Sequence, residues 1–167
     1  SPDGKYLAYV SQRSQGLSDN RAHLVIRSLE TGDERVMPTI FQGAGKPLWL
    51  PDGHGLIVLA RNGQNHTTLY RVDLTRGQID TLLDTGKSAP QLAALSPDGR
   101  TVYFSSGAPE NLLKNHVVAY DLASGRRTDV THGGTSRAMA ASPDGRSIAF
   151  VATETITPPF RGDLHVA

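Results

Sequence analysis

Ser96-Pro97-Asp98-Gly99, followed by Arg100-Thr101-Val102-Tyr103-Phe104, is the stretch that decides the fold. Proline presets φ for a turn, aspartate bonds to nearby backbone, and glycine accepts positive φ, so the first four residues predict a tight turn. The apolar, β-branched and aromatic residues that follow predict a β-strand leaving that turn.

The same turn recurs along the chain at a nearly constant interval. Its prolines, Pro2, Pro51, Pro97 and Pro143, are 49, 46 and 46 residues apart, and each precedes Asp-Gly. A period of about 40–50 residues in a strand-rich sequence is typical of propeller blades rather than of helical repeats.

The strand after each turn is apolar on both faces. Its third and fifth positions after the glycine are Leu7 and Tyr9, Leu56 and Val58, Val102 and Phe104, and Ile148 and Phe150, and the position between them is also mostly apolar. A strand with one exposed face alternates apolar with polar residues. Blades that stack around an axis cover their middle strands on both sides, which fits this pattern.

A second motif, a β-rich run ending in a glycine turn, follows at 24–32, 69–77 and 117–125 and begins again at 164–166. Each unit is therefore expected to have four strands, A to D: A enters the Pro-Asp-Gly turn, B leaves it, C carries the second motif, and D follows. We expect strand A at 47–50, 92–95 and 138–141, and strand D at 35–37, 78–83 and 127–130. The predicted fold is all-β: one partial domain over 1–167, an incomplete β-propeller of four-stranded antiparallel blades stacked around an axis. The blades are approximately 1–43 (lacking A), 44–88, 89–135 and 136–167 (lacking D).

This order of motifs resembles the WD-type blades of the TolB-like β-propeller family over nearly the whole chain. The family usually has Trp-Ser before Pro-Asp-Gly; here Trp49 and Leu50 stand there, and Leu95 and Ala141 replace the aromatic residue elsewhere. The resemblance implies a ring of about six to eight blades in a longer bacterial parent protein. It also implies a periplasmic or secreted location, which the residues themselves leave unknown.

Composition excludes several classes of protein. Seventeen Lys and Arg residues nearly balance sixteen Asp and Glu, so we expect no nucleic acid and no anionic membrane as partner. The absence of cysteine excludes disulfides and thiolate metal sites. The longest aliphatic run, Leu56–Ala60, is far shorter than the roughly 20 residues of a membrane span.

No catalytic, metal or cofactor site is predicted. Asp52, Asp98 and Asp144 could form a ring of carboxylates, but the turn interpretation is strongly favoured. The six histidines show no metal-ligand spacing, 134–138 lacks the last glycine of G-x-S-x-G, and Pro47 interrupts the phosphate-loop-like 43–46. The predicted structural turn residues are Pro51, Asp52, Gly53, Pro97, Asp98, Gly99, Pro143, Asp144 and Gly145.

Binding is expected at one end of the blades. In an up-and-down blade the A–B and C–D turns share one end, and the B–C and D–A connections share the other. The second end carries the variable loops 12–21, 62–66, 107–115 and 154–162 and is rich in basic residues. The predicted binding residues are three at the channel mouth, Lys46, Lys87 and Arg137, and six on the loops, Arg13, Arg21, Arg61, Lys114, Phe160 and Arg161. Ordinary solvated charge, and a Phe160 packed under its own loop, are the alternatives.

Three functions fit these features. The first is a non-enzymatic scaffold that binds a protein or peptide. The second is the non-catalytic gating propeller of a prolyl-oligopeptidase-like serine peptidase, whose hydrolase domain would lie outside this chain. The third, an enzyme active at the ring centre, is disfavoured because the A strands offer no histidine or carboxylate. Exposed blade faces further predict self-association or marginal stability of the isolated segment.

Overall fold

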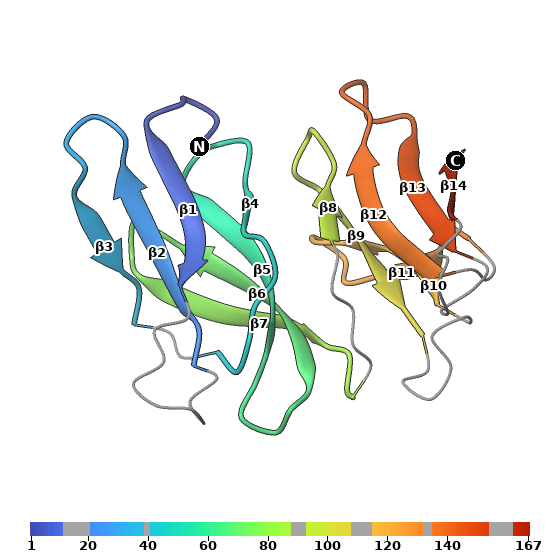
Figure 1. Cartoon of the computed structure of the whole chain (residues 1–167), viewed down its shortest axis with the longest axis horizontal. Helices are drawn as coiled ribbons and strands as arrows, with labels where there is room; N and C mark the ends of the chain where they lie inside the picture. Colours follow the sequence, from blue (N-terminus) through green and yellow to red (C-terminus); the bar gives the residue numbers. More distant parts are fainter. Residues whose placement is uncertain (12–20, 39–40, 88–92, 108–114, 132–134, 154–161) are drawn as a thin grey trace. The chain divides into compact units, whose positions relative to one another are not determined.

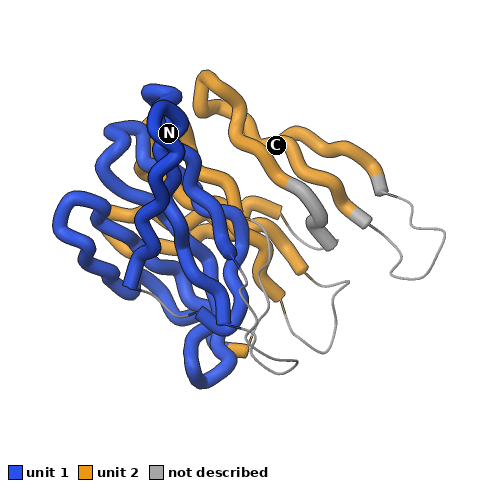
Figure 2. Tube along the Cα trace, turned by 60° about the vertical axis from the view of Figure 1, so that its left-hand side comes forward, with its two compact units in different colours: residues 1–86 blue, residues 87–167 orange. Residues whose placement is uncertain are grey.

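A computed structural model describes residues 1–11, 21–38, 41–87, 93–107, 115–131, 135–153 and 162–167. The described residues form strands β1 to β14 in four antiparallel sheets and contain no helix. They divide into two compact units, residues 1–86 and 87–167 (Figure 2). The expected all-β class is confirmed.

Unit 1 holds two sheets, each a simple antiparallel meander (Figure 1). The first has the order β1 (Tyr6–Ser11), β2 (His23–Ser28) and β3 (Glu34–Val36). The second has the order β4 (Leu48–Trp49), β5 (Gly55–Arg61), β6 (Thr67–Asp73) and β7 (Gln78–Asp84).

Unit 2 repeats this plan with the incomplete sheet last. Its four-stranded sheet has the order β8 (Ala93–Leu95), β9 (Thr101–Ser106), β10 (His116–Asp121) and β11 (Arg127–Asp129). Its three-stranded sheet consists of β12 (Thr135–Ala141), β13 (Ile148–Thr153) and β14 (Gly162–Val166).

Two of the expected A strands differ in length from those observed. β4 is only Leu48–Trp49, because the pairing with β5 is split into two stretches. The earlier stretch consists of the Ala44–Ala60 bridge and the Gly45 N–H donated to the Leu59 carbonyl. Pro47, which has no N–H, separates the two stretches. β12, in contrast, begins at Thr135 and tolerates a bulge between Ser136 and Met139.

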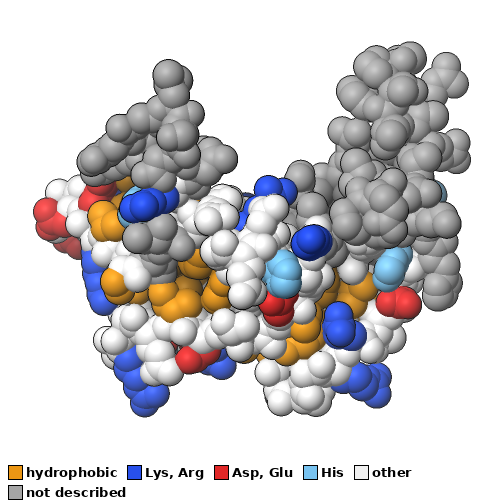
Figure 3. Space-filling view, turned by 90° about the horizontal axis from the view of Figure 1, so that it is seen from below, with side chains coloured by type: hydrophobic (Ala, Val, Ile, Leu, Met, Phe, Trp, Pro, Cys, Tyr) orange, Lys and Arg blue, Asp and Glu red, His pale blue; other side chains and the backbone are white. Residues whose placement is uncertain are grey.

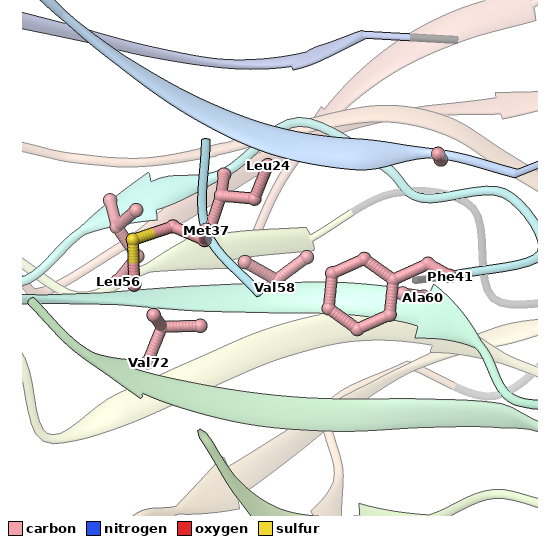
Figure 4. Packing of buried hydrophobic residues seen from close by; sticks show 8 residues of the cluster. Leu24, Met37, Phe41, Leu56, Val58, Ala60 and Val72 are labelled. Atoms are coloured by element: carbon pink, nitrogen blue, oxygen red, sulfur yellow. The ribbon is translucent and has the colours of Figure 1, made fainter. Parts of the chain in front are cut away.

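The core of unit 1 lies between its two sheets (Figure 4). Leu24 of β2, with Met37 and Phe41, packs against Leu56 and Val58 of β5. From Gly55 to Ala60 every residue of β5 is buried, so both faces of this strand are covered, as its composition predicts.

Unit 2 is organised in the same way. Val102 and Phe104 of β9 are buried, and Val117 of β10 packs with Ile148 and Phe150 of β13. The strands that leave the Pro-Asp-Gly turns are thus well buried in three of the four sheets: β5 is the most buried strand of its sheet, β9 has as many buried residues as β10, and β13 contributes Ile148 and Phe150 to the core.

β1 is the exception. Ala8 and Val10 face the second sheet and pack against the core of unit 1. Leu7, on the other face of β1, is 48% exposed, whereas its equivalent in the second sheet, Leu56, is 0% exposed. Apolar side chains are exposed near the other end of the chain too, at Leu164 and Val166 of β14.

Leu7 and Leu56 form a matched pair for a stability test, because they occupy the same repeat position at different burial. We expect Leu56→Ala to lower the free energy of unfolding by about 2–5 kcal/mol through lost burial and a cavity. Leu7→Ala should cost less than about 1 kcal/mol, since its side chain is half in water already. Urea denaturation of both variants measures the difference; equal losses would contradict the burial described here.

Exposed apolar side chains on β1 and β14 also lead us to expect self-association. Sedimentation velocity at a low and a high protein concentration should show a larger species at high concentration. The double variant Leu7→Glu, Leu164→Glu should shift the distribution towards monomer, because a charge on an apolar contact surface opposes its burial. A monomer at every concentration in the unsubstituted chain would refute this expectation.

Candidate functional site

Each Pro-Asp-Gly turn that begins with serine contains the same set of internal hydrogen bonds. In the turn at 96–99, the Gly99 N–H is donated to the Ser96 carbonyl at 2.9 Å, and Gly99 has φ +71°. The Ser96 hydroxyl is donated to Asp98 Oδ1 at 2.6 Å and itself accepts the Thr101 N–H at 2.9 Å. Asp98 Oδ1 also accepts the Arg100 N–H at 3.0 Å. Serine and aspartate thus fix the start of the following strand.

The turns at 1–4 and 142–145 have the same bonds, and the turn at 50–53 has fewer. Ser1 and Ser142 each donate to the aspartate two residues later. Leu50 has no hydroxyl, and Asp52 Oδ1 accepts only the His54 N–H, at 2.8 Å. The leucine side chain is instead buried, 6% exposed, beside Gly55.

These bonds lower the pKa of the turn carboxyls. For Asp3, Asp98 and Asp144 the largest cause is the serine hydroxyl, followed by the next backbone N–H, and the pKa of each lies below the ordinary 3.8. All three side chains are ionised at neutral pH and directed into their own turns. We therefore assign them no part in a catalytic site.

The opposite, loop end of unit 1 is cross-linked by polar contacts. His66 Nδ1 lies 3.1 Å from Asp84 Oδ2, which joins the start of β6 to the end of β7. Asp84 Oδ1 accepts the Gly86 N–H at 2.7 Å, and this bond first, then His66, lowers the pKa of Asp84. Asn62 Oδ1 accepts the N–H groups of Gln64 and His66, so the turn 62–66 is held by its own side chain.

Unit 2 has a comparable contact at its loop end. His116 Nε2 lies 3.2 Å from Asp129 Oδ1 and joins the start of β10 to the end of β11. The Val117 N–H is donated to the Thr131 hydroxyl at 2.9 Å. In both units the beginning of strand C is thus fastened to the end of strand D.

Those predicted basic residues that the structure describes lie at the loop ends of their strands. In unit 1, Arg21 precedes β2, Lys46 precedes β4 and Arg61 ends β5, and all three are exposed. In unit 2, Lys87 is exposed, and Arg137 lies within β12. Arg13, Lys114, Phe160 and Arg161 lie outside the described residues. Figure 3 shows this end; on the atoms not drawn in grey, Lys and Arg side chains are scattered, with Asp, Glu and His side chains between them.

No catalytic constellation is assembled among the described residues. Within them, no group of three His, Cys, Asp or Glu side chains is arranged to hold a metal ion. Neither His66 nor His116 has a described hydroxyl hydrogen-bonded to its other ring nitrogen, which a triad would need. The described part of the chain also holds no helix that could cross a membrane.

One hollow was not anticipated from the sequence. It lies at the Pro-Asp-Gly end of unit 1, between the two sheets, and its lining includes Tyr6, Glu30, Trp49 and Leu74. Because these residues come from two repeats, the sequence does not show that they lie together. Trp49, the isolated aromatic residue before a Pro-Asp-Gly turn, is the one feature of the hollow that the sequence singled out.

Antiparallel meanders of three or four strands, repeated along the chain around buried middle strands such as β5, define the chain as part of a β-propeller. It belongs to the TolB beta propeller domain family, whose sequence profile matches residues 1–158. The propeller expected from the motifs is thus confirmed.

Two curated relatives carry peptidase names. The chain is 30% identical over 158 residues, 94% of its length, to the uncharacterized peptidase YuxL of Bacillus subtilis, but spans only 22% of that protein. It is 32% identical over 80 residues to dipeptidyl-peptidase 5 of Porphyromonas gingivalis, covering 47% of this chain and 12% of the peptidase. The chain is thus homologous to parts of peptidases.

A solved structure of a TolB protein is also similar. The TolB of Acinetobacter baumannii superposes with a TM-score of 0.78 at 25% identity, over 98% of this chain and 39% of the TolB chain. The chain thus spans less than half of the length of that TolB chain.

The serine–aspartate network leads to a pH-dependent prediction. Asp98→Asn should lower stability at about pH 7, because a carboxylate that accepts these hydrogen bonds is replaced by a neutral amide. The pKa of Asp98 is lowered in the folded state, so its contribution is present above 3.8 and is lost as pH falls through the lowered pKa. The gap in melting temperature between Asp98→Asn and the unsubstituted chain should therefore narrow as the pH is lowered below 3.8.

Asp52→Asn is the matched control, because Asp52 occupies the same turn position without a serine partner. It should lower the melting temperature less than Asp98→Asn at neutral pH. Equal losses for the two variants would show that the serine hydroxyl adds nothing to the turn.

Proposed function

We propose that this chain is a segment of the non-catalytic propeller of a peptidase, and that the propeller restricts which substrates reach a hydrolase domain elsewhere in the protein. The observation that carries the proposal is the similarity to the peptidase YuxL over 94% of the chain. The second peptidase relative, dipeptidyl-peptidase 5, supports the same assignment over a shorter segment.

The chemistry of the described residues is consistent with a gating role. The carboxylates of the Pro-Asp-Gly turns are occupied within their own turns. The His66–Asp84 and His116–Asp129 pairs join neighbouring strands. Peptide-bond hydrolysis needs a nucleophile, a base and an oxyanion site, and under this proposal those groups come from the hydrolase domain.

The loop end is the side we propose for contact with substrate or with that domain. Loops on a rigid scaffold commonly carry binding, and here the loop ends of strands C and D are fastened by the two His–Asp pairs. The residues proposed for this contact remain the apolar Phe160 and eight basic residues, Lys46, Lys87, Arg137, Arg13, Arg21, Arg61, Lys114 and Arg161.

A scaffold that binds a protein or peptide without an attached hydrolase is the second candidate. It is favoured by the superposition on the TolB of Acinetobacter baumannii. The peptidase proposal ranks higher because the YuxL alignment has higher sequence identity, 30% against 25%, over a comparable share of the chain.

The complete coding sequence and the complete protein distinguish the two candidates. The peptidase proposal expects a G-x-S-x-G segment followed by Asp and His in the same reading frame. It also expects the complete protein to release p-nitroaniline from short peptidyl-p-nitroanilides, while the 167-residue chain alone releases none. Substitution of that serine by alanine should abolish release.

Gating itself needs a separate readout. The complete protein should cleave short peptides and leave a folded protein substrate intact, because a propeller excludes bulky chains. A reading frame that encodes only further blades, or a complete protein inactive on peptides, would overturn the peptidase proposal and leave the scaffold.

A further inference from the structure

The hollow at the Pro-Asp-Gly end of unit 1 is a groove between the first and second sheets. It has a volume of about 590 Å³. One wall is the turn between β2 and β3, and the other is formed by Trp49, His54 and Leu74 of the second sheet. In Figure 1 the β2–β3 and β4–β5 turns lie at the same end of this unit.

The groove continues towards the Pro-Asp-Gly turns. A second hollow of about 480 Å³ lies between Pro2-Asp3 and Pro51-Asp52, and it shares Tyr6, Gly53 and His54 with the first. The two hollows therefore adjoin, and we refer to them together as the trough. The volume of each is in the range of small-molecule sites, and two adjoining hollows can receive neighbouring residues of an extended peptide.

The floor of the trough is apolar and firmly held. Trp49 packs on one side against the core cluster of unit 1 and on the other side lines the groove. Ile26 and Leu74 lie beside it, and Tyr6, which is 44% exposed, stands where the two hollows meet. Aromatic rings held in this way offer large contact area and a negative face to a cation.

The wall formed by the β2–β3 turn is acidic. Glu30, Asp33 and Glu34 all line the groove. Glu34 Oε1 accepts the Tyr9 hydroxyl at 2.8 Å and lies 3.3 Å from Arg27 Nη1, and Asp33 Oδ2 accepts the Thr31 hydroxyl at 2.7 Å. These bonds fix two of the carboxylates, and Glu30 is exposed at the turn.

The basic groups of the lining do not cancel this charge. Arg35 donates from Nη1 to the Leu74 carbonyl at 3.0 Å, so its guanidinium connects the two walls. Three carboxylates line the groove, against Arg35 of the lining and Arg27, which lies outside the lining and is paired with Glu34 at 3.3 Å, so one negative charge remains in excess. An anionic ligand would meet these carboxylates at short range, whereas a cation would be attracted by them and by the aromatic faces.

We propose that this trough binds an extended peptide segment of a partner protein that carries Arg or Lys between aliphatic residues. The cation lies over Trp49 and Tyr6 and faces the acidic wall, and an aliphatic neighbour packs on Ile26 and Leu74. The site is independent of the proposed peptidase role and lies at the opposite end of the unit from the loops assigned to it.

Trp49 gives the test a direct readout, because it is the one tryptophan of the chain. The probe is an acetylated, amidated Leu-Arg-Leu-Lys-Leu peptide, titrated into the 167-residue chain at low salt with selective tryptophan excitation. We expect a saturable change in Trp49 emission that weakens as salt is added. The same peptide with Glu in place of Arg and Lys should bind at least about tenfold more weakly.

Charge reversal locates the site. Glu30→Lys should weaken binding of the basic peptide about threefold to tenfold, because it converts an attraction at the groove wall into a repulsion. Asp163→Lys, an equal charge change at an exposed position of β14, should leave the affinity unchanged. Glu30→Gln removes the charge without introducing lysine, and it should weaken binding less than Glu30→Lys. Circular dichroism of each variant checks that lysine has not disturbed the turn.

Three outcomes would overturn the proposal: no change in Trp49 emission with the basic peptide, equal binding of the acidic peptide, or equal weakening by Glu30→Lys and Asp163→Lys. Binding of free arginine amide as tightly as of the pentapeptide would also overturn it, since it would show a cation site without peptide recognition. None of these outcomes bears on the peptidase proposal, whose test is hydrolysis by the complete protein.

Discussion

The need to cover both faces of the strand that leaves each Pro-Asp-Gly turn is the constraint on which this structure depends. Successive side chains of a strand point to opposite faces, so a run such as Leu56-Ile57-Val58-Leu59 cannot lie in a single layer without exposing half of it. Each such side chain contributes about 1.5–3 kcal/mol when buried. Sheets must therefore stack on both sides of this strand, and stacking is what turns a row of meanders into a propeller.

The Pro-Asp-Gly turn makes this stacking repeatable. Proline and a glycine at positive φ set the direction of the chain, and the serine and aspartate side chains satisfy the first N–H groups of the next strand. The turn at 50–53 keeps its shape without the serine, because Leu50 packs beside Gly55 and adds apolar burial in place of a hydrogen bond. The aspartates are thus explained by local structure and give no indication of a catalytic site.

The repeat, the strand order and the burial of both faces of β5 could be predicted from the sequence, because each depends on residues within a single short segment. Turn residues and apolar columns are local features. The short β4 could not be predicted in the same way, because it follows from Pro47 together with the earlier pairing of Ala44 to Ala60. The contact between His66 and Asp84 could not be predicted from the sequence either, since the register between β6 and β7 shifts at a bulge between Leu69 and Tyr70. The acidic groove was missed because its walls belong to different repeats, and neither the packing of Ile26 and Trp49 on one core cluster nor the hydrogen bond from Arg35 to Leu74 can be read from a single segment.

The two ends of unit 1 differ in a way that bears on both proposals. At the loop end, exposed Arg21, Lys46 and Arg61 stand beside strand ends that are fastened by a histidine–aspartate contact. At the turn end, three carboxylates and two aromatic rings line a groove whose walls are held together by a hydrogen bond. Since like charges oppose and opposite charges favour association, the two proposals assign acidic surfaces to the loop end and a basic peptide to the turn end. The two proposed ligands do not compete for space, because the loops and the groove lie at opposite ends of the same strands.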